Sequence, residues 1–296
     1  MGKLFEKAFG VRPDEQPLVA GFFFLFVIIG MFYTVGVAVG DTLFLANVSA
    51  EEMPRLYPWV YVGIAAGTIG WAVAHHRLQA KISRFAYVVG TQLGIGLAVV
   101  VLRQLCELDT SWMFFILLVC LEVSALVYIT LFFSFAGDYF SPRAARRVFG
   151  VIVGGMAVGT VAAGYLVRHA VDLMDTPDLL YVAAGLAMLG TLVSSLLFRI
   201  GTPLEDAVVI DERQVETLSV RHLARQRYLR AVGIAVTLTL VMAVLVDYQM
   251  KWVASDLPEA ELAVFFGGFY EWVGLAQLAF QVLLVPPSLR ILGIIN

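Results

Sequence analysis

Residues 18–46 read LVAGFFFLFVIIGMFYTVGVAVGDTLFLA, an apolar run in which Asp41 is the only charged side chain. A helix needs about 20 mostly apolar residues to cross the hydrocarbon core of a bilayer. This run is longer than that, so it predicts a membrane-spanning helix with one acid near its end. An ionisable group in a bilayer costs about 2.5–3.5 kcal/mol even on insertion scales, so Asp41 is a candidate functional residue. A place at the outer end of the helix would also account for it.

Seven further runs of the same character follow. Hydrophobic residues make up 60% of the chain and charged residues 15%, whereas soluble domains average about 45–50% and about 25%. The runs lack the alternating pattern of a transmembrane strand, and a helix satisfies its own backbone hydrogen bonds in lipid. We therefore predict an all-α, polytopic helical membrane protein with spans at 18–46, 57–74, 85–102, 112–135, 148–167, 179–198, 229–250 and 262–285.

The Lys and Arg residues are divided unevenly between the segments that connect these spans. Of the 20, we count 16 on the side of the N-terminus and 4 on the opposite side. Cytoplasmic loops carry the excess of Lys and Arg in membrane proteins. The distribution predicts a multi-pass protein of a bacterial inner (plasma) membrane with both ends in the cytoplasm.

A second acid, Asp247, stands in a stretch like the one around Asp41. The offset is 247 − 41 = 206, and the same offset pairs Ser49 with Ser255. Each acid lies near the end of a long apolar run and is followed by a short acidic connection. Repeats of this kind, with acids at equivalent depths, are typical of transporters.

The repeat also predicts how the chain is organised. Six spans, a charged connection and a restart similar to the first span favour a major facilitator-like layout with parallel repeats. We assign residues 1–198 to a six-helix N-terminal half, 199–228 to a central cytoplasmic loop and 229–296 to the first two helices of a second half. On this interpretation four more helices would follow, and a genuine eight-helix protein is the alternative.

The acids within the spans, and one lysine near them, form the candidate site. Asp247 and Lys251 are four residues apart, which puts them on one helix face within ion-pair reach. Glu122 and Glu271 lie deep in their spans, where a carboxylate facing lipid is hard to sustain. We predict that Asp41, Glu122, Asp247, Lys251 and Glu271 point into one central cavity and bind substrate or couple its transport. The alternatives are that Lys251 reaches the outer interface, where Asp247 neutralises it, and that each glutamate makes a structural hydrogen bond.

A basic segment follows the fourth span and contains Asp138, Arg143, Arg146 and Arg147. The simplest interpretation is a cytoplasmic loop whose arginines set the topology. The second interpretation is a gating loop in which Asp138 forms an ion pair with one of these arginines.

Glycines at a spacing of four follow this basic segment. Gly150 and Gly154 form one such pair, and Gly155 and Gly159 form the next. Small residues at this spacing let two helix backbones approach closely in a membrane. The pattern predicts close helix packing, either as a static contact or as a sliding interface between halves.

Three stretches resemble the ATP/ADP translocases of plastids and intracellular bacteria and their bacterial relatives, which have the major facilitator fold. Gly40-Asp41-Thr42-Leu43 is similar to a Lys-Asp-Thr-Leu signature on the first helix, and Gly40 stands where the exchangers carry Lys. Leu121-Glu122-Val123, with the basic segment after it, resembles the fourth-helix acid and its exit loop. Asp247-Tyr-Gln-Met-Lys251 is similar to a Glu-x-x-x-Lys pair on the seventh helix.

These observations predict a secondary membrane transporter. Its expected activity is nucleotide (ATP/ADP-type) exchange or organic-anion transport by alternating access. The alternative is a non-transporting, transporter-like membrane anchor or sensor module. The sequence has no phosphate-binding loop, paired metal-ligand spacing or nucleophile elbow, so we expect neither an enzyme nor a cofactor or metal. The expected partners are a small anionic substrate, with a nucleotide as the leading candidate, and the lipid bilayer. No nucleic-acid partner is expected, and no sequence signal specifies an oligomeric state.

Overall fold

A computed structural model describes residues 11–13, 15–48, 51–79, 81–108, 110–204 and 226–283. In these ranges all regular structure is helical. The order of elements is α2 (Gln16–Asn47), α3 (Met53–Gln79), α4 (Arg84–Leu105), η1 (Cys106–Leu108), α5 (Ser111–Gly137), α6 (Pro142–Ala170), η2 (Thr176–Asp178), α7 (Leu179–Ile200), α10 (Arg227–Ala254) and α11 (Glu259–Leu283).

The described chain contains eight helices that are long and apolar enough to cross a membrane, one for each predicted span. The prediction of a multi-pass helical membrane protein is therefore confirmed. Most of the predicted central loop, residues 205–225, lies outside the described residues.

The start of α6 differs from the prediction. The helix begins at Pro142, because the Ser141 hydroxyl accepts a hydrogen bond from the amide of Ala144 at 3.4 Å and proline suits the first turn of a helix. The arginines 143, 146 and 147 therefore belong to the first two turns of α6. Their assignment to a loop is wrong, because sequence hydropathy marks only the apolar part of a helix.

Helix α2 lies in the middle of the first six helices and packs against α5, α6 and α7. Several of its aromatic side chains are buried against α5, where the rings of Phe26 and Phe132 stack with centroids 4.2 Å apart. Phe22 is fully buried and Phe32 nearly so, and they pack on Phe135 and Tyr128 respectively. These contacts fix the first half of α2 against α5.

Glycines of α6 bring that helix against α2. A Cβ at Gly155 would lie 2.6 Å from the carbonyl oxygen of Phe23, and one at Gly159 would collide with the backbone of Val27. The close approach predicted for this pair is confirmed. At Gly150 a Cβ would meet no described atom within 4 Å, so the same spacing does not mark a helix contact there.

A second set of glycines brings α6 against α11. A Cβ at Gly164 would lie 2.7 Å from the carbonyl oxygen of Gly267, and one at Gly267 would lie 2.7 Å from the amide nitrogen of Arg168. Gly274 approaches the amide of Val161 in the same way, at 2.8 Å. Helix α6 is thus closely packed between α2 and α11.

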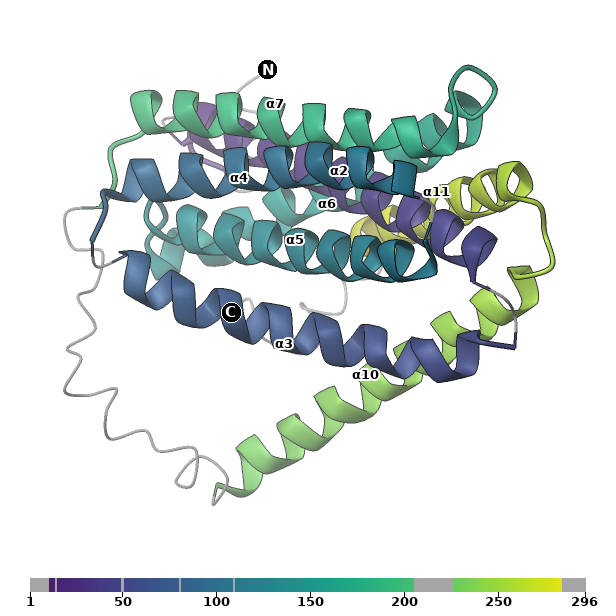
Figure 1. Ribbon diagram of the computed structural model, residues 1–296. Helices are drawn as coiled ribbons and strands as arrows, with labels where there is room; N and C mark the ends of the chain where they lie inside the picture. The colour runs from purple at the N-terminus through teal and green to yellow at the C-terminus, as the bar shows by residue number, and fades with distance from the viewer. Residues whose placement is uncertain are drawn as a thin grey trace.

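Helix α10 lies apart from this packed group. Figure 1 shows it running obliquely past α3, converging with the start of α3 at its own C-terminal end and diverging toward its N-terminal end. Its buried residues are Lys251 and Ala254, both in its last two turns. The end of α10 that carries Lys251 is therefore where this helix joins the rest of the described structure.

Candidate functional site

Lys251 is at the centre of the candidate site. Its ammonium nitrogen lies 2.7 Å from Oδ1 of Asp41 on α2 and 2.9 Å from Oδ2 of Asp247 on its own helix. The side chain of Lys251 is 5% exposed and that of Asp41 is 0% exposed, whereas that of Asp247 is 28% exposed. One buried cation is thus shared by two carboxylates, and one of the two ion pairs joins α10 to α2.

Two tyrosines of α3 bind the other side of the same network. The hydroxyl of Tyr57 donates a hydrogen bond to Oδ2 of Asp247, and that of Tyr61 donates to the same oxygen at 3.1 Å. The ammonium of Lys251 also lies over the ring of Tyr57, 5.4 Å from its centroid. A cation at this position over an aromatic ring is attracted by the ring quadrupole. Asp247 is therefore held by three donors and Lys251 by two carboxylates and a ring.

The chain path explains why these residues meet. Asp41 is close to the C-terminal end of α2, and Tyr57 is in the second turn of α3 after a short connection. Asp247 and Lys251 are in the last turns of α10. All four residues thus lie at one end of their helices and at one level of the fold.

Asp41 has an incomplete set of partners. The carboxylate is fully buried, and among the described residues its Oδ2 has no hydrogen-bond partner. A buried carboxylate normally has hydrogen bonds to both oxygens, because the loss of hydration must be replaced. The ion pair with Lys251 at Oδ1 is the stabilising contact that Asp41 makes.

Glu122 on α5 lies near the same network. Its carboxylate interacts electrostatically with Lys251 and Asp247, although it forms no ion pair within hydrogen-bond distance with any described residue. Tyr33 on α2 and Tyr270 on α11 interact with the same charges. The region therefore contains three carboxyl groups, one lysine and four tyrosine side chains from three helices.

Glu271 forms an ion pair with a residue other than Lys251, and its place in one cavity with the other acids stays a prediction. Its carboxylate oxygen Oε2 lies 3.5 Å from Nη1 of Arg168 on α6. The glycine contacts at Gly164 and Gly267 bring α6 and α11 close enough for this pair to form. The preceding residue, Tyr270, faces the Lys251 network instead, because adjacent helical residues point in different directions.

The described ion pair of Asp138 is with Arg84 on α4, and a pair with an arginine of the basic segment stays a hypothesis. Oδ2 of Asp138 accepts from Nε of Arg84 at 2.7 Å, and Nη2 of Arg84 donates to Ser134. Arg147 pairs with Glu15 at 3.0 Å. Arg143 is exposed at the start of α6, and the side chain of the arginine at 146 lies outside the description.

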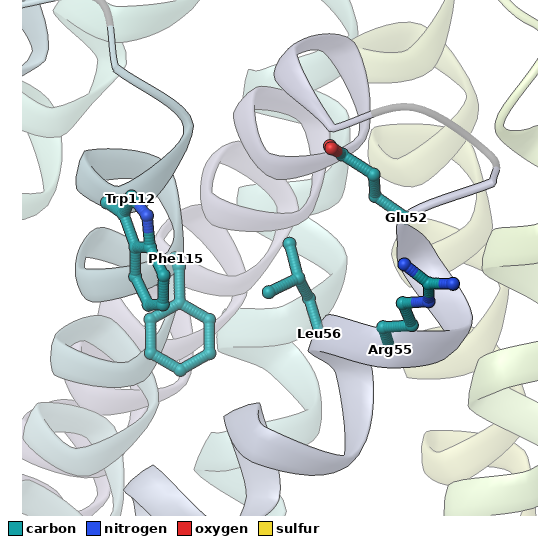
Figure 2. A pocket seen from close by; sticks show the side chains of 5 residues that line it. All are labelled: Glu52, Arg55, Leu56, Trp112 and Phe115. Atoms are coloured by element: carbon teal, nitrogen blue, oxygen red, sulfur yellow. The ribbon is translucent and has the colours of Figure 1, made fainter.

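A pocket of about 350 Å³ lies between the beginnings of α3 and α5. Figure 2 shows Glu52, Arg55 and Leu56 on one side of it and Trp112 and Phe115 on the other. Its two charged side chains have opposite signs and are exposed. Leu56 lines this pocket, and the next residue of α3, Tyr57, belongs to the ion network.

The tyrosines of the site were missed by the sequence analysis. Tyr57 and Tyr61 are four residues apart, a spacing that places two hydroxyls on one helix face. Tyrosine near a helix end is common at membrane interfaces, so the spacing alone does not separate a polar site from an interfacial position.

No family model, curated protein or solved structure matches the chain.

Proposed function

We propose that the protein is a secondary transporter of the major facilitator type that moves a small organic anion across the bacterial inner membrane by alternating access. The observation that carries the proposal is the buried ion pair between Lys251 and Asp41, which joins α10 to α2. Charged side chains within membrane-spanning segments are costly and usually serve a substrate or ion pathway.

The position of the ion pair supports this function. Helix α10 is otherwise little buried, and its ionic contact with α2 lies in the same turns as its hydrogen bonds with α3. A contact made of charges can break when a competing charge arrives, whereas an apolar contact has no such trigger. Opening and closing of this pair would let α10 move relative to the first six helices.

The repeat supports the major facilitator layout. Asp41 and Asp247 are separated by the repeat offset, and both contact the same ammonium group. Equivalent residues of two halves meet in this way when the halves are related by an axis along the membrane normal. The distribution of Lys and Arg supports cytoplasmic ends, which puts the ion network in the outer half of the bilayer.

Lys251 is the proposed contact for the anion. It is the buried lysine of the described chain, and its neighbours Tyr57 and Tyr61 supply ring faces and hydroxyl groups. The likeness of Asp41, Glu122 and the Asp247–Lys251 pair to the ATP/ADP translocases makes a nucleotide the first substrate to test.

Uptake by proteoliposomes that contain the full-length protein tests the proposal. Labelled ATP and ADP are compared with labelled dicarboxylates, and Lys251→Gln is compared with Lys81→Gln, which removes an exposed lysine from the turn before α4. We expect uptake of one anion class that Lys251→Gln abolishes and Lys81→Gln leaves intact. Absence of uptake for every anion would favour a membrane anchor or sensor.

Labelling of introduced cysteines tests the orientation. A reagent that does not cross the membrane should leave a cysteine at position 211 unmodified in intact cells and should modify one at Asp256. The reverse pattern would place the ends of the chain outside and the ion network in the inner half of the bilayer.

A further inference from the structure

We propose that Asp41 is a proton-binding site and that a proton on Asp41 releases Lys251 from α2. Proton binding is inferred from the charges of the site alone. Its use as the coupling ion of transport rests on the proposed function.

The charges of the network are unequal. Lys251 carries one positive charge, whereas Asp41 and Asp247 would together carry two negative charges when ionised. The group would then have a net charge of −1, and Glu122 nearby would add to it rather than offset it. A net charge in a low-dielectric interior is strongly unfavourable, so such a site takes up a counter-ion or a proton.

The two aspartates differ in their ability to remain ionised. Asp247 is partly exposed and accepts hydrogen bonds from Tyr57 and Tyr61 in addition to its contact with Lys251. Asp41 is fully buried, and its Oδ2 has no described partner. Hydrogen bonds to a carboxylate favour its charged form, whereas burial disfavours it. The proton therefore goes to Asp41.

The geometry also excludes the other nearby groups as the main proton carrier. A tyrosine is neutral when protonated and gains a buried negative charge when it loses the proton. This applies to the four tyrosines near the site, Tyr33, Tyr57, Tyr61 and Tyr270. Glu122 is more exposed than Asp41, and the described ion pairs of Lys251 are with Asp41 and Asp247 instead. Asp41 is thus the carboxyl group that is fully buried, contacts the ammonium of Lys251 and has an oxygen atom without a described hydrogen-bond partner.

The consequence for the helices follows from where each ion pair lies. A hydronium ion of the solution gives its proton to Oδ2 of Asp41 and leaves as water, and the net charge of the three residues changes from −1 to 0. The contact between α10 and α2 then becomes a hydrogen bond from the ammonium to an uncharged carboxyl group, whereas Lys251 keeps its ion pair with Asp247 on the same helix. Proton binding therefore weakens the contact between helices and leaves the contact within α10 unchanged.

Infrared difference spectroscopy of the purified full-length protein tests the proton site without any substrate. The carbonyl stretch of a protonated carboxyl group is distinct from that of a carboxylate and shifts in heavy water. In the wild type, raising the pH should remove such a band belonging to one buried carboxyl. Asp41→Asn should lack this band, whereas Asp256→Asn, which changes an exposed acid, should retain it.

Three outcomes would overturn the proposal. The band could persist in Asp41→Asn and vanish in Glu122→Gln, which would assign the proton to α5. It could be displaced by Na⁺ at constant pH, which would make the site a cation site. It could also be absent from the wild type at every pH.

A second variant keeps the test decisive if Asp41→Asn does not fold. Lys251→Gln removes the cation that stabilises ionised Asp41, so the band should persist to higher pH than in the wild type. A band that vanishes at the same pH in both proteins would contradict the assignment. Because these measurements need no substrate, they can succeed even if transport fails.

Discussion

Replacement of Lys251 by methionine should destabilise the protein through Asp41. The substitution keeps a long side chain but removes the counter-charge of Asp41, so at a pH where wild-type Asp41 is ionised the buried carboxyl group must stay unpaired or take up a proton. Breaking a buried ion pair by removing one partner costs about 3–5 kcal/mol. Asp247 is affected less, because it is partly exposed and keeps its hydrogen bonds from Tyr57 and Tyr61. Most of the loss should therefore come from the buried acid on α2.

The measurement is thermal unfolding of the purified protein in detergent, followed by tryptophan fluorescence. For a chain of this size 1 kcal/mol corresponds to a change in Tm of about 2 °C, so Lys251→Met should lower Tm by about 6–10 °C. Lys81→Met, at an exposed position, should change Tm by about 1 °C or less.

The double variant Asp41→Asn/Lys251→Met separates the two causes of instability. Removing both charges leaves no buried ion, so the double variant should be more stable than Lys251→Met alone. The reasoning is refuted if the losses of the two single variants add, or if Lys251→Met unfolds at the same temperature as Lys81→Met. Additive losses would mean that the two side chains do not interact in the folded protein.

Three further variants test individual contacts of the fold and the site by the same unfolding measurement. Gly159→Leu should destabilise the protein by about 3 kcal/mol, because its Cβ would collide with the backbone of α2. Gly150→Leu places its Cβ in open space and should be nearly neutral. Equal effects of the two variants would contradict the contact between α2 and α6. Tyr57→Phe should cost about 1.5–3 kcal/mol, because it removes a hydrogen bond to a charged group, and no loss would mean that this hydroxyl does not bind Asp247. Arg84→Gln should cost about 1 kcal/mol or less, since its ion pair is partly exposed, and a large loss would show that this pair holds the helix ends together.

The sequence was sufficient to predict the helices because lipid imposes a strong rule on composition. A spanning helix must be apolar over a fixed length, so the eight runs could be located without knowledge of their packing. Because this rule concerns only the apolar part of a helix, it does not locate the polar ends. The polar first turns of α6 depend on the cap at Ser141 and Pro142, which hydropathy does not measure.

The site was only partly predictable, because spacing within a helix is visible in sequence and contact between helices is not. The pairing of Asp247 with Lys251 follows from their separation of four residues and is present in the structure. The contact of Asp41 with the same lysine depends on how α10 crosses α2. For Glu271 the sequence indicated the depth in the span but not the direction of the side chain. The direction depends on the glycines that bring α6 against α11, where Glu271 pairs with Arg168.

The remaining consequence concerns how an anion reaches Lys251. The ammonium is already neutralised by two carboxylates, so an incoming anion must replace one of them. Replacement is less costly when Asp41 is protonated, because no displaced negative charge then remains buried. Binding of the anion should therefore require one proton, and the apparent Kd should rise about tenfold for each unit of pH above the titration of Asp41 and level off below it. Equilibrium binding of the transported anion at a series of pH values measures this slope. In Asp41→Asn, which is neutral at every pH, the affinity should stay close to the acid limit of the wild type. A wild-type affinity independent of pH, or an equal slope in Asp41→Asn, would show that the anion does not compete with Asp41 for Lys251.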